Sequence, residues 1–193
     1  IDGLANIAGV PPTLAAETVL RVNTIGLRQL TKALIPKMSD GANIVNLASL
    51  AGNGWADNLD QVRRTLTLTL DDDVAQFCTD EELNNADGQS YFLSKQALIV
   101  WTMQNRWTWR DRDINMNCIS PGPVATPILA DFVETLGERV EEDMKVMDRA
   151  AEVTDIAPVV SFALSSGAKW LRGTNIETDG GMKRHILAQA HAI

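Results

Sequence analysis

The sequence predicts an α/β fold built on an open sheet of parallel strands, and three observations predict it. The apolar run Ile1 to Ala8 ends at Gly9, as expected for a strand that is buried on both faces. Residues 18–38 carry apolar side chains at helical spacing, and Ala42 to Leu47 form a second apolar run. A strand, a helix and a strand in this order make a βαβ unit, whose two strands are parallel.

The same alternation continues through the rest of the chain. We expect a long helix over residues 90–109 and a third strand over Ile114 to Ile119 with a proline–glycine turn behind it. Beyond that turn, a charged helical stretch over 128–149, a helix over 154–164 and a last strand over 174–178 follow. In a sheet of this kind ligands bind at the carboxyl ends of the strands, so the residues behind each strand are the first candidates for a site.

Composition indicates one soluble globular domain without nucleic-acid or membrane partners. The chain has 193 residues, a 45% hydrophobic content and a formal charge of −8. Residues 53–89 hold nine acids against two bases and so carry −7 of that charge, and such an acidic segment repels nucleic acids and anionic membranes. Apolar runs of membrane-spanning length are absent from the sequence.

Neither the cysteines nor the histidines have a spacing typical of metal sites. Cys78 and Cys118 are read as reduced thiols of a cytoplasmic protein, and His185 and His191 lie near the tail. We therefore expect chemistry that needs no metal. The acidic run at residues 71–73 is interpreted as solvated surface.

A tyrosine and a lysine carry the strongest chemical signal. Tyr91 is the only tyrosine, and Lys95 follows it at i+4, so both side chains lie on one face of the predicted helix. A phenol loses its proton near pH 10 in water, and a neighbouring cation stabilises the phenolate. The pair is therefore suited to general acid–base chemistry.

Other polar and glycine residues stand at the ends of the predicted strands in a set order. Asn6, Ala8 and Gly9 close the first strand, Ser49 follows the second, and Asn23 lies inside the first helix. Pro121 and Gly122, with Val124 and Thr126 just beyond, follow the third strand.

This ordered set resembles the short-chain dehydrogenase/reductase family over essentially the whole chain. The resemblance implies a Rossmann-like doubly wound parallel sheet, of which these residues form the C-terminal two-thirds of a single domain. It implies that Ser49 hydrogen-bonds the substrate oxygen, that Tyr91 is the acid and base, and that Lys95 holds the nicotinamide ribose and lowers the Tyr91 pKa. Asn23 would hold a water in a proton relay, although a buried amide that only ties a helix to the backbone is the structural alternative.

The resemblance also implies a nicotinamide cofactor, NAD, with NADP left open. The cofactor-binding residues would be Asn6, Ala8, Gly9, Tyr91, Lys95, Pro121, Gly122, Val124 and Thr126. Gly9 would lie beneath the adenosine ribose, where a missing side chain permits close approach. The loop from Pro121 to Thr126 would hold the carboxamide.

Ser49 and Tyr91 are 42 positions apart, far more than in most members of that family. We interpret residues 53–89 as an acidic insertion. An insertion here is similar to the branch of bacterial 3α-hydroxysteroid dehydrogenase/carbonyl reductase and coniferyl-alcohol dehydrogenase. The resemblance implies oxidation of a bulky apolar alcohol, of the aryl-allylic or hydroxysteroid type, or reduction of the ketone. The insertion should also obstruct the tetramer contact of many relatives, which predicts a homodimer.

The glycine-rich pyrophosphate loop of the family, T-G-x-x-x-G-x-G, does not occur in these residues. We therefore expect two βα units before Ile1. The missing loop also keeps a different class open, a non-catalytic scaffold subunit, and no residue excludes a dehydratase or an epimerase.

Overall fold

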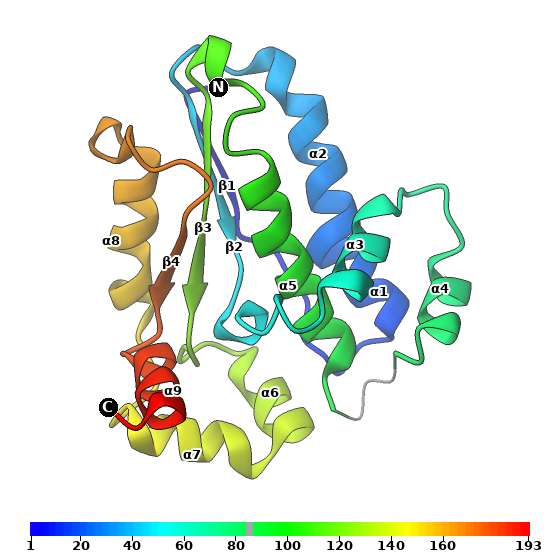
Figure 1. Cartoon of the computed structure of the whole chain (residues 1–193), viewed down its shortest axis with the longest axis vertical. Helices are drawn as coiled ribbons and strands as arrows, with labels where there is room; N and C mark the ends of the chain where they lie inside the picture. The colour runs from blue at the N-terminus through cyan, green and yellow to red at the C-terminus, as the bar shows by residue number, and fades with distance from the viewer. Residues whose placement is uncertain (84–86) are drawn as a thin grey trace.

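The computed structural model describes residues 1–83 and 87–193, so residues 84–86 of the predicted insertion lie outside the described part. Helices and strands alternate along the chain (Figure 1). In order they are β1 (Gly3–Asn6), α1 (Ala16–Leu20), the π-helical segment η1 (Arg21–Gly26), α2 (Leu27–Leu34), β2 (Asn43–Leu47), α3 (Leu59–Thr67), α4 (Val74–Asp80), α5 (Gln89–Gln104), β3 (Asn115–Pro121), α6 (Leu129–Leu136), α7 (Glu138–Val146), α8 (Val153–Leu164), β4 (Asn175–Thr178) and α9 (Met182–His191).

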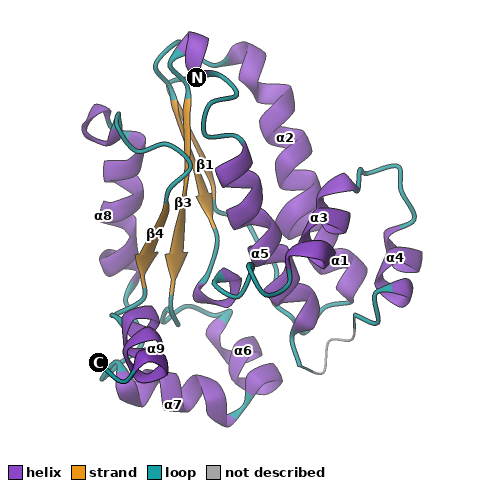
Figure 2. Ribbon diagram, viewed as in Figure 1, coloured by secondary structure: helices purple, strands orange, loops and turns teal. Residues whose placement is uncertain are grey.

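The four strands form one parallel sheet in the order β1-β2-β3-β4. Helices cover both faces of this sheet, with α1, α2 and α5 on one side and α8 on the other (Figure 2). The expected doubly wound α/β sheet is therefore confirmed.

Alternation along the strands explains the two layers. Ile44 and Met116 pack with Leu98 of α5 in one apolar cluster, whereas Val45 packs with Val160 of α8 in another. Successive side chains of a strand point to opposite faces, so the central strands β2 and β3 each contribute to both clusters. This is why the strands read as continuous apolar runs.

Segment 53–89 folds against the outer side of the layer that contains α1 and α5. Val62 of α3 and Val74 of α4 belong to the same buried cluster as Leu93 and Ala97 of α5. Figure 1 shows both helices lying beside α1 and α5, away from the sheet. Their apolar faces thus cover an otherwise open side of α5.

Several expected element boundaries are wrong. The helix predicted over residues 90–109 ends at Gln104, and a series of turns follows it. The stretch 128–149 is two helices, because Gly137 adopts a positive φ of 56° between them. Helix α9 was not expected.

Among the described helices, none combines the length and the apolar character that crossing a membrane requires.

Candidate active site

A cavity of about 780 Å³ opens at the carboxyl ends of the strands, where a ligand site is expected in an α/β sheet. Its walls come from the loops behind β1, β2 and β3, from α5, and from α6 to α9. Eight of the predicted site residues line it: Gly9, Ser49, Tyr91, Lys95, Pro121, Gly122, Val124 and Thr126. Asn6, Ala8 and Asn23 are not among the lining residues.

Tyr91 and Lys95 project from the first turns of α5, and both are almost completely buried, with 9% and 5% of their surfaces exposed. The Lys95 ammonium lies 5.4 Å from the centre of the Tyr91 ring and donates a hydrogen bond of 2.9 Å to the Leu47 carbonyl. Because Leu47 ends β2, the sheet fixes the lysine. Within residues 1–83 and 87–193 the ammonium has no other hydrogen-bond acceptor, so its remaining protons are left for a ligand in the cavity.

Ser49 stands behind β2, and its hydroxyl lies near that of Tyr91 and lowers the Tyr91 pKa. It also accepts a hydrogen bond from the backbone N–H of Ala51 at 3.2 Å, which fixes its side chain at the start of a short turn. The two hydroxyls are thus brought together from elements that are far apart in the sequence. Together they form a place for one substrate oxygen.

Burial dominates the protonation of this pair. It raises the pKa of Tyr91 to about 12, against a smaller lowering by the Ser49 hydroxyl. It lowers the pKa of Lys95 to about 8. Burial disfavours both the Tyr91 phenolate and the Lys95 ammonium. The protonation states of the two side chains therefore depend on the ligand that occupies the cavity.

Asn23 lies in the π-helical segment, a distortion that often occurs at functional positions. Its amide oxygen accepts from the Val10 N–H at 2.8 Å, and its amide nitrogen donates to the Val10 carbonyl at 3.0 Å. The side chain therefore anchors the loop behind β1. A water held by Asn23 stays a prediction.

Gly9 lies in that anchored loop, at a position where a side chain would crowd neighbouring polar groups. A Cβ at this position would stand 3.2 Å from the Asn23 amide oxygen and 3.8 Å from the Lys95 ammonium. The loop can therefore run close to both polar groups. The open space above Gly9 and the free protons of Lys95 suit a ligand with hydroxyl groups, such as a ribose.

The Asn6 side chain is turned into the protein. Its amide nitrogen donates to Asn46 Oδ1 at 2.8 Å and to Thr31 Oγ1 at 2.9 Å, which links β1 to β2 and to α2. A direct cofactor contact would therefore come from its backbone. Ala8, by contrast, is exposed in the following loop.

The loop behind β3 forms another wall of the cavity. Val124 pairs with Ala151 in an isolated bridge, and the Thr126 N–H donates to the Val124 carbonyl at 2.8 Å. A Cβ on Gly122 would lie 3.4 Å from the Asp179 backbone. The loop thus lies beside Ala151 and beside Asp179, the residue that follows β4, and Pro121, Gly122, Val124 and Thr126 line the cavity.

Sequence reasoning missed two groups of cavity residues. Phe132 of α6 contacts the Tyr91 ring edge-on, with the ring centres 4.8 Å apart and the planes at 72°. Gln96 follows Lys95 directly on α5 and also lines the cavity. The apolar stripe of residues 128–136 was the available signal for the first group, whereas the second depends on how segment 53–89 folds back.

Comparison with known proteins agrees with this geometry. The family model described as enoyl-(acyl carrier protein) reductase matches residues 78–183. Coniferyl-alcohol dehydrogenase of Pseudomonas sp. strain HR199 is 39% identical over 184 residues, a match that covers 94% of this chain and 71% of the relative. The 3α-hydroxysteroid dehydrogenase/carbonyl reductase of Comamonas testosteroni is 29% identical over 188 residues, with 94% and 72% covered.

A solved structure gives the same fold. The crystal structure of 3α-hydroxysteroid dehydrogenase from Pseudomonas sp. B-0831 complexed with NADH is similar with a TM-score of 0.84 and 26% identity. The match covers 98% of this chain and 75% of that one. With its parallel sheet and with Ser49, Tyr91 and Lys95 at one cavity, the chain belongs to the short-chain dehydrogenase/reductase family.

Proposed function

We propose that the protein oxidises a bulky, largely apolar alcohol with NAD, or reduces the matching carbonyl compound, with Tyr91 as acid and base. This proposal rests on one observation: Ser49, Tyr91 and Lys95 lie together at a cavity whose other walls are mainly apolar. The aryl-allylic and hydroxysteroid alcohols of the named relatives fit such walls.

Apolar side chains line most of the part of the cavity that lies next to Tyr91. They come from five helices, α5 to α9, and would shield the place where the hydroxyls of Ser49 and Tyr91 meet from bulk water once a substrate is bound. The set is Phe92, Leu129, Phe132, Leu136, Val140, Val153, Ile156, Val160, Ile186 and Leu187. A substrate with a flat or polycyclic hydrocarbon body would replace water here at little cost.

The proton chemistry follows from the same groups. In the oxidation, the substrate hydroxyl would donate its proton to the Tyr91 phenolate while the Ser49 hydroxyl donates to the substrate oxygen. Charged Lys95 beside the ring favours the phenolate and so works against the rise of the Tyr91 pKa that burial causes. In the reduction the phenol returns the proton.

The cofactor would be held by Lys95 at the ribose hydroxyls, by the loop from Pro121 to Thr126 at the carboxamide, and by Asn6, Ala8 and Gly9 near the adenosine. When bound, the nicotinamide supplies the carbon that accepts or gives the hydride. We propose NAD rather than NADP because the hydroxysteroid dehydrogenase of similar structure was crystallised with NADH.

We propose further that the protein is a homodimer of the cytoplasm and that residues 53–89 are an insertion. Val62 of α3 and Cys78 of α4 cover the side of α5 that carries Leu93 and Val100, so this side is not free for another subunit. Both cysteines are buried free thiols, which suits a reducing compartment.

The test uses the protein with whatever natural sequence precedes Ile1. We expect calorimetry to show NADH binding, and NADH absorbance to report oxidation of a cinnamyl-type or 3-hydroxysteroid alcohol. NADH binding without turnover of any alcohol or ketone would favour a dehydratase or an epimerase. Absence of both would favour the non-catalytic scaffold.

A further inference from the structure

The wall of the cavity formed by the turn behind Ser49 and by the adjoining part of α5 is polar and takes no part in the proton chemistry. The turn behind Ser49 contributes Asn53, Gly54 and Asp57 to this wall, and α5 contributes Gln96. The remainder of the lining near α5 is apolar or belongs to the Tyr91 and Lys95 pair. Polar groups in such a place fix the orientation of a ligand.

The Gln96 amide is buried and held in one orientation. Only 8% of the residue is exposed, and its amide oxygen accepts a hydrogen bond of 2.9 Å from Asn58 Nδ2. The amide nitrogen lies near Gly54, 3.4 Å from where a Cβ there would stand. Since Gly54 and Gln96 both line the cavity, the amide nitrogen is close enough to donate a hydrogen bond to a ligand there.

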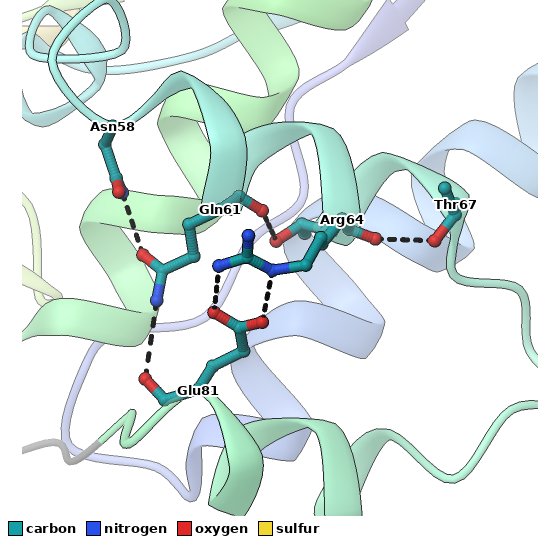
Figure 3. A network of polar contacts seen from close by, with 6 residues as sticks. Asn58, Gln61, Arg64, Thr67 and Glu81 are labelled. Atoms are coloured by element: carbon teal, nitrogen blue, oxygen red, sulfur yellow. Dashed lines mark hydrogen bonds and ion pairs between the residues drawn. The ribbon is translucent and has the colours of Figure 1, made fainter.

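Segment 53–89 supports this orientation through a chain of polar contacts (Figure 3). The amide nitrogen of Asn58 also donates to Gln61 Oε1 at 2.9 Å, and Gln61 Nε2 donates to the Glu81 carbonyl at 3.4 Å. Arg64 binds the Glu81 carboxylate with two nitrogens, one of them at 2.7 Å. These contacts join α3 to the C-terminal end of α4, next to Asn58, which binds Gln96.

Two neighbours of Gln96 make the wall suitable for a hydroxyl group. Asp57 adds a carboxylate acceptor, and its backbone N–H donates to the Gly54 carbonyl at 3.3 Å, which keeps it beside Gly54. The amide nitrogen of Asn53 is buried and has no hydrogen-bond partner in residues 1–83 and 87–193. A hydroxyl can donate to a carboxylate and accept from an amide at once.

We propose that Gln96 and Asp57 form a recognition site for a second hydroxyl group of the substrate, remote from the one that reacts at Tyr91. This inference rests on the proposed function and narrows it to alcohols with such a group. Tyr91 and Gln96 are five residues apart on α5, so their backbones are separated by about 7.5 Å along the helix axis. The two hydroxyls would accordingly stand at opposite ends of the substrate's hydrocarbon body.

The test compares cinnamyl alcohol with 4-hydroxycinnamyl alcohol, which differ only in the remote hydroxyl. For the wild-type protein we expect kcat/KM to be about tenfold or more higher for the hydroxylated alcohol, because its hydroxyl meets a charged acceptor and a fixed donor. In Gln96→Met, which keeps the length of the side chain, this ratio should fall at least about fivefold, mainly through a higher KM for the hydroxylated alcohol.

Gln96→Glu is the second variant. It keeps the oxygen that Asn58 holds but replaces the donor by an acceptor beside Asp57, so the ratio should fall again even if Gln96→Met does not fold. Gln104→Leu, an exposed position at the end of α5, is the matched control and should leave both rate constants unchanged.

Equal kcat/KM for the two alcohols in the wild-type protein, or an unchanged ratio in both Gln96 variants, would overturn the recognition site alone. Failure to oxidise these two alcohols and any 3-hydroxysteroid alike would contradict the proposed function, and the recognition site with it. The two failures are therefore distinguishable in one series of assays.

Discussion

Two buried ionisable side chains dominate the site at the scale of single residues. Tyr91 and Lys95 are both desolvated, and their pKa values shift to about 12 and about 8, which disfavours both charges. The Leu47 carbonyl and the Ser49 hydroxyl only partly offset this burial. The protein therefore maintains a costly arrangement at the place where proton transfer is proposed.

Lys95→Met should stabilise the protein at neutral pH. Burial of the ammonium costs about 3 kcal/mol, as the fall of its pKa from 10.5 to about 8 implies, and loss of the bond to Leu47 offsets about 1 kcal/mol. We therefore expect a free energy of unfolding that is about 2 kcal/mol higher at pH 7, measured by urea titration.

The difference in the free energy of unfolding between the wild-type protein and Lys95→Met should depend on pH. Between about pH 8 and 10.5 the unfolded chain keeps the Lys95 proton while the folded protein has lost it, so stability contributed by this residue rises with pH. The advantage of Lys95→Met should shrink through this window. A constant difference would show that Lys95 is not desolvated.

Phe132 should act on Tyr91 by covering its ring. Phe132→Leu removes the edge-on contact, worth about 0.5–1.5 kcal/mol, and lets water approach the phenol. We expect kcat/KM to fall roughly two- to tenfold, and the apparent pKa in its pH profile to move down as the desolvation of Tyr91 weakens.

The control for this change is Phe162→Leu, at an exposed position of α8. It should alter neither the rate nor the profile. If Phe132→Leu lowered the rate but left the pH profile in place, the contact would serve packing alone.

At the scale of elements, the acidic segment 53–89 owes its order to one ion pair as well as to its apolar face. Arg64 and Glu81 join α3 to the end of α4 with two hydrogen bonds, and the Arg64 guanidinium holds the pKa of the carboxyl below its usual range. Arg64→Met should therefore loosen both helices. Hydrogen exchange should be faster in residues 59–67 and 74–80.

Arg63→Met is a matched control in the same helix, because the one ion pair of Arg63 within the described part of the chain is with the exposed Asp60 one turn away. It should leave the exchange rates nearly unchanged. Equal protection in the Arg64 variant and in the wild-type protein would mean that the apolar faces of α3 and α4 suffice.

The elements also show how far the sequence could be interpreted alone. Strand positions and the site at their ends were predictable, because a buried parallel strand is a short apolar run and Ser49 and Pro121 stand behind two of them. The π-helical turn at Asn23 was not predictable from the sequence. It accompanies hydrogen bonds between Asn23 and the loop at Val10, and these contacts exist only in the folded chain.

Long-range contacts explain the other differences. The apolar residues Trp107 and Trp109 continue the helical pattern of α5, but the chain turns after Gln104 to reach β3. Asn6 matched a cofactor position in the sequence, yet its side chain is occupied by Asn46, which lies 40 residues away. Such pairings depend on the register of β1 with β2 and cannot be seen in a local pattern.

On the scale of the whole molecule, one parallel sheet carries the cavity at its carboxyl end, and segment 53–89 closes the outer side of α5. Covering this helix removes a surface through which subunits could associate. The protein should therefore run as a dimer in size-exclusion chromatography with light scattering, at all concentrations that permit detection. A tetramer with the segment intact would contradict the proposed role of the insertion.

The proposed alcohol oxidation depends on Tyr91 as the group that moves the proton. The most direct measurement compares turnover and NADH binding of Tyr91→Phe with those of the wild-type protein. We expect NADH affinity to change less than about threefold and kcat to fall by at least about a thousandfold, because the acid and base is gone while the cavity is intact. Full turnover of an accepted alcohol by Tyr91→Phe would contradict the account.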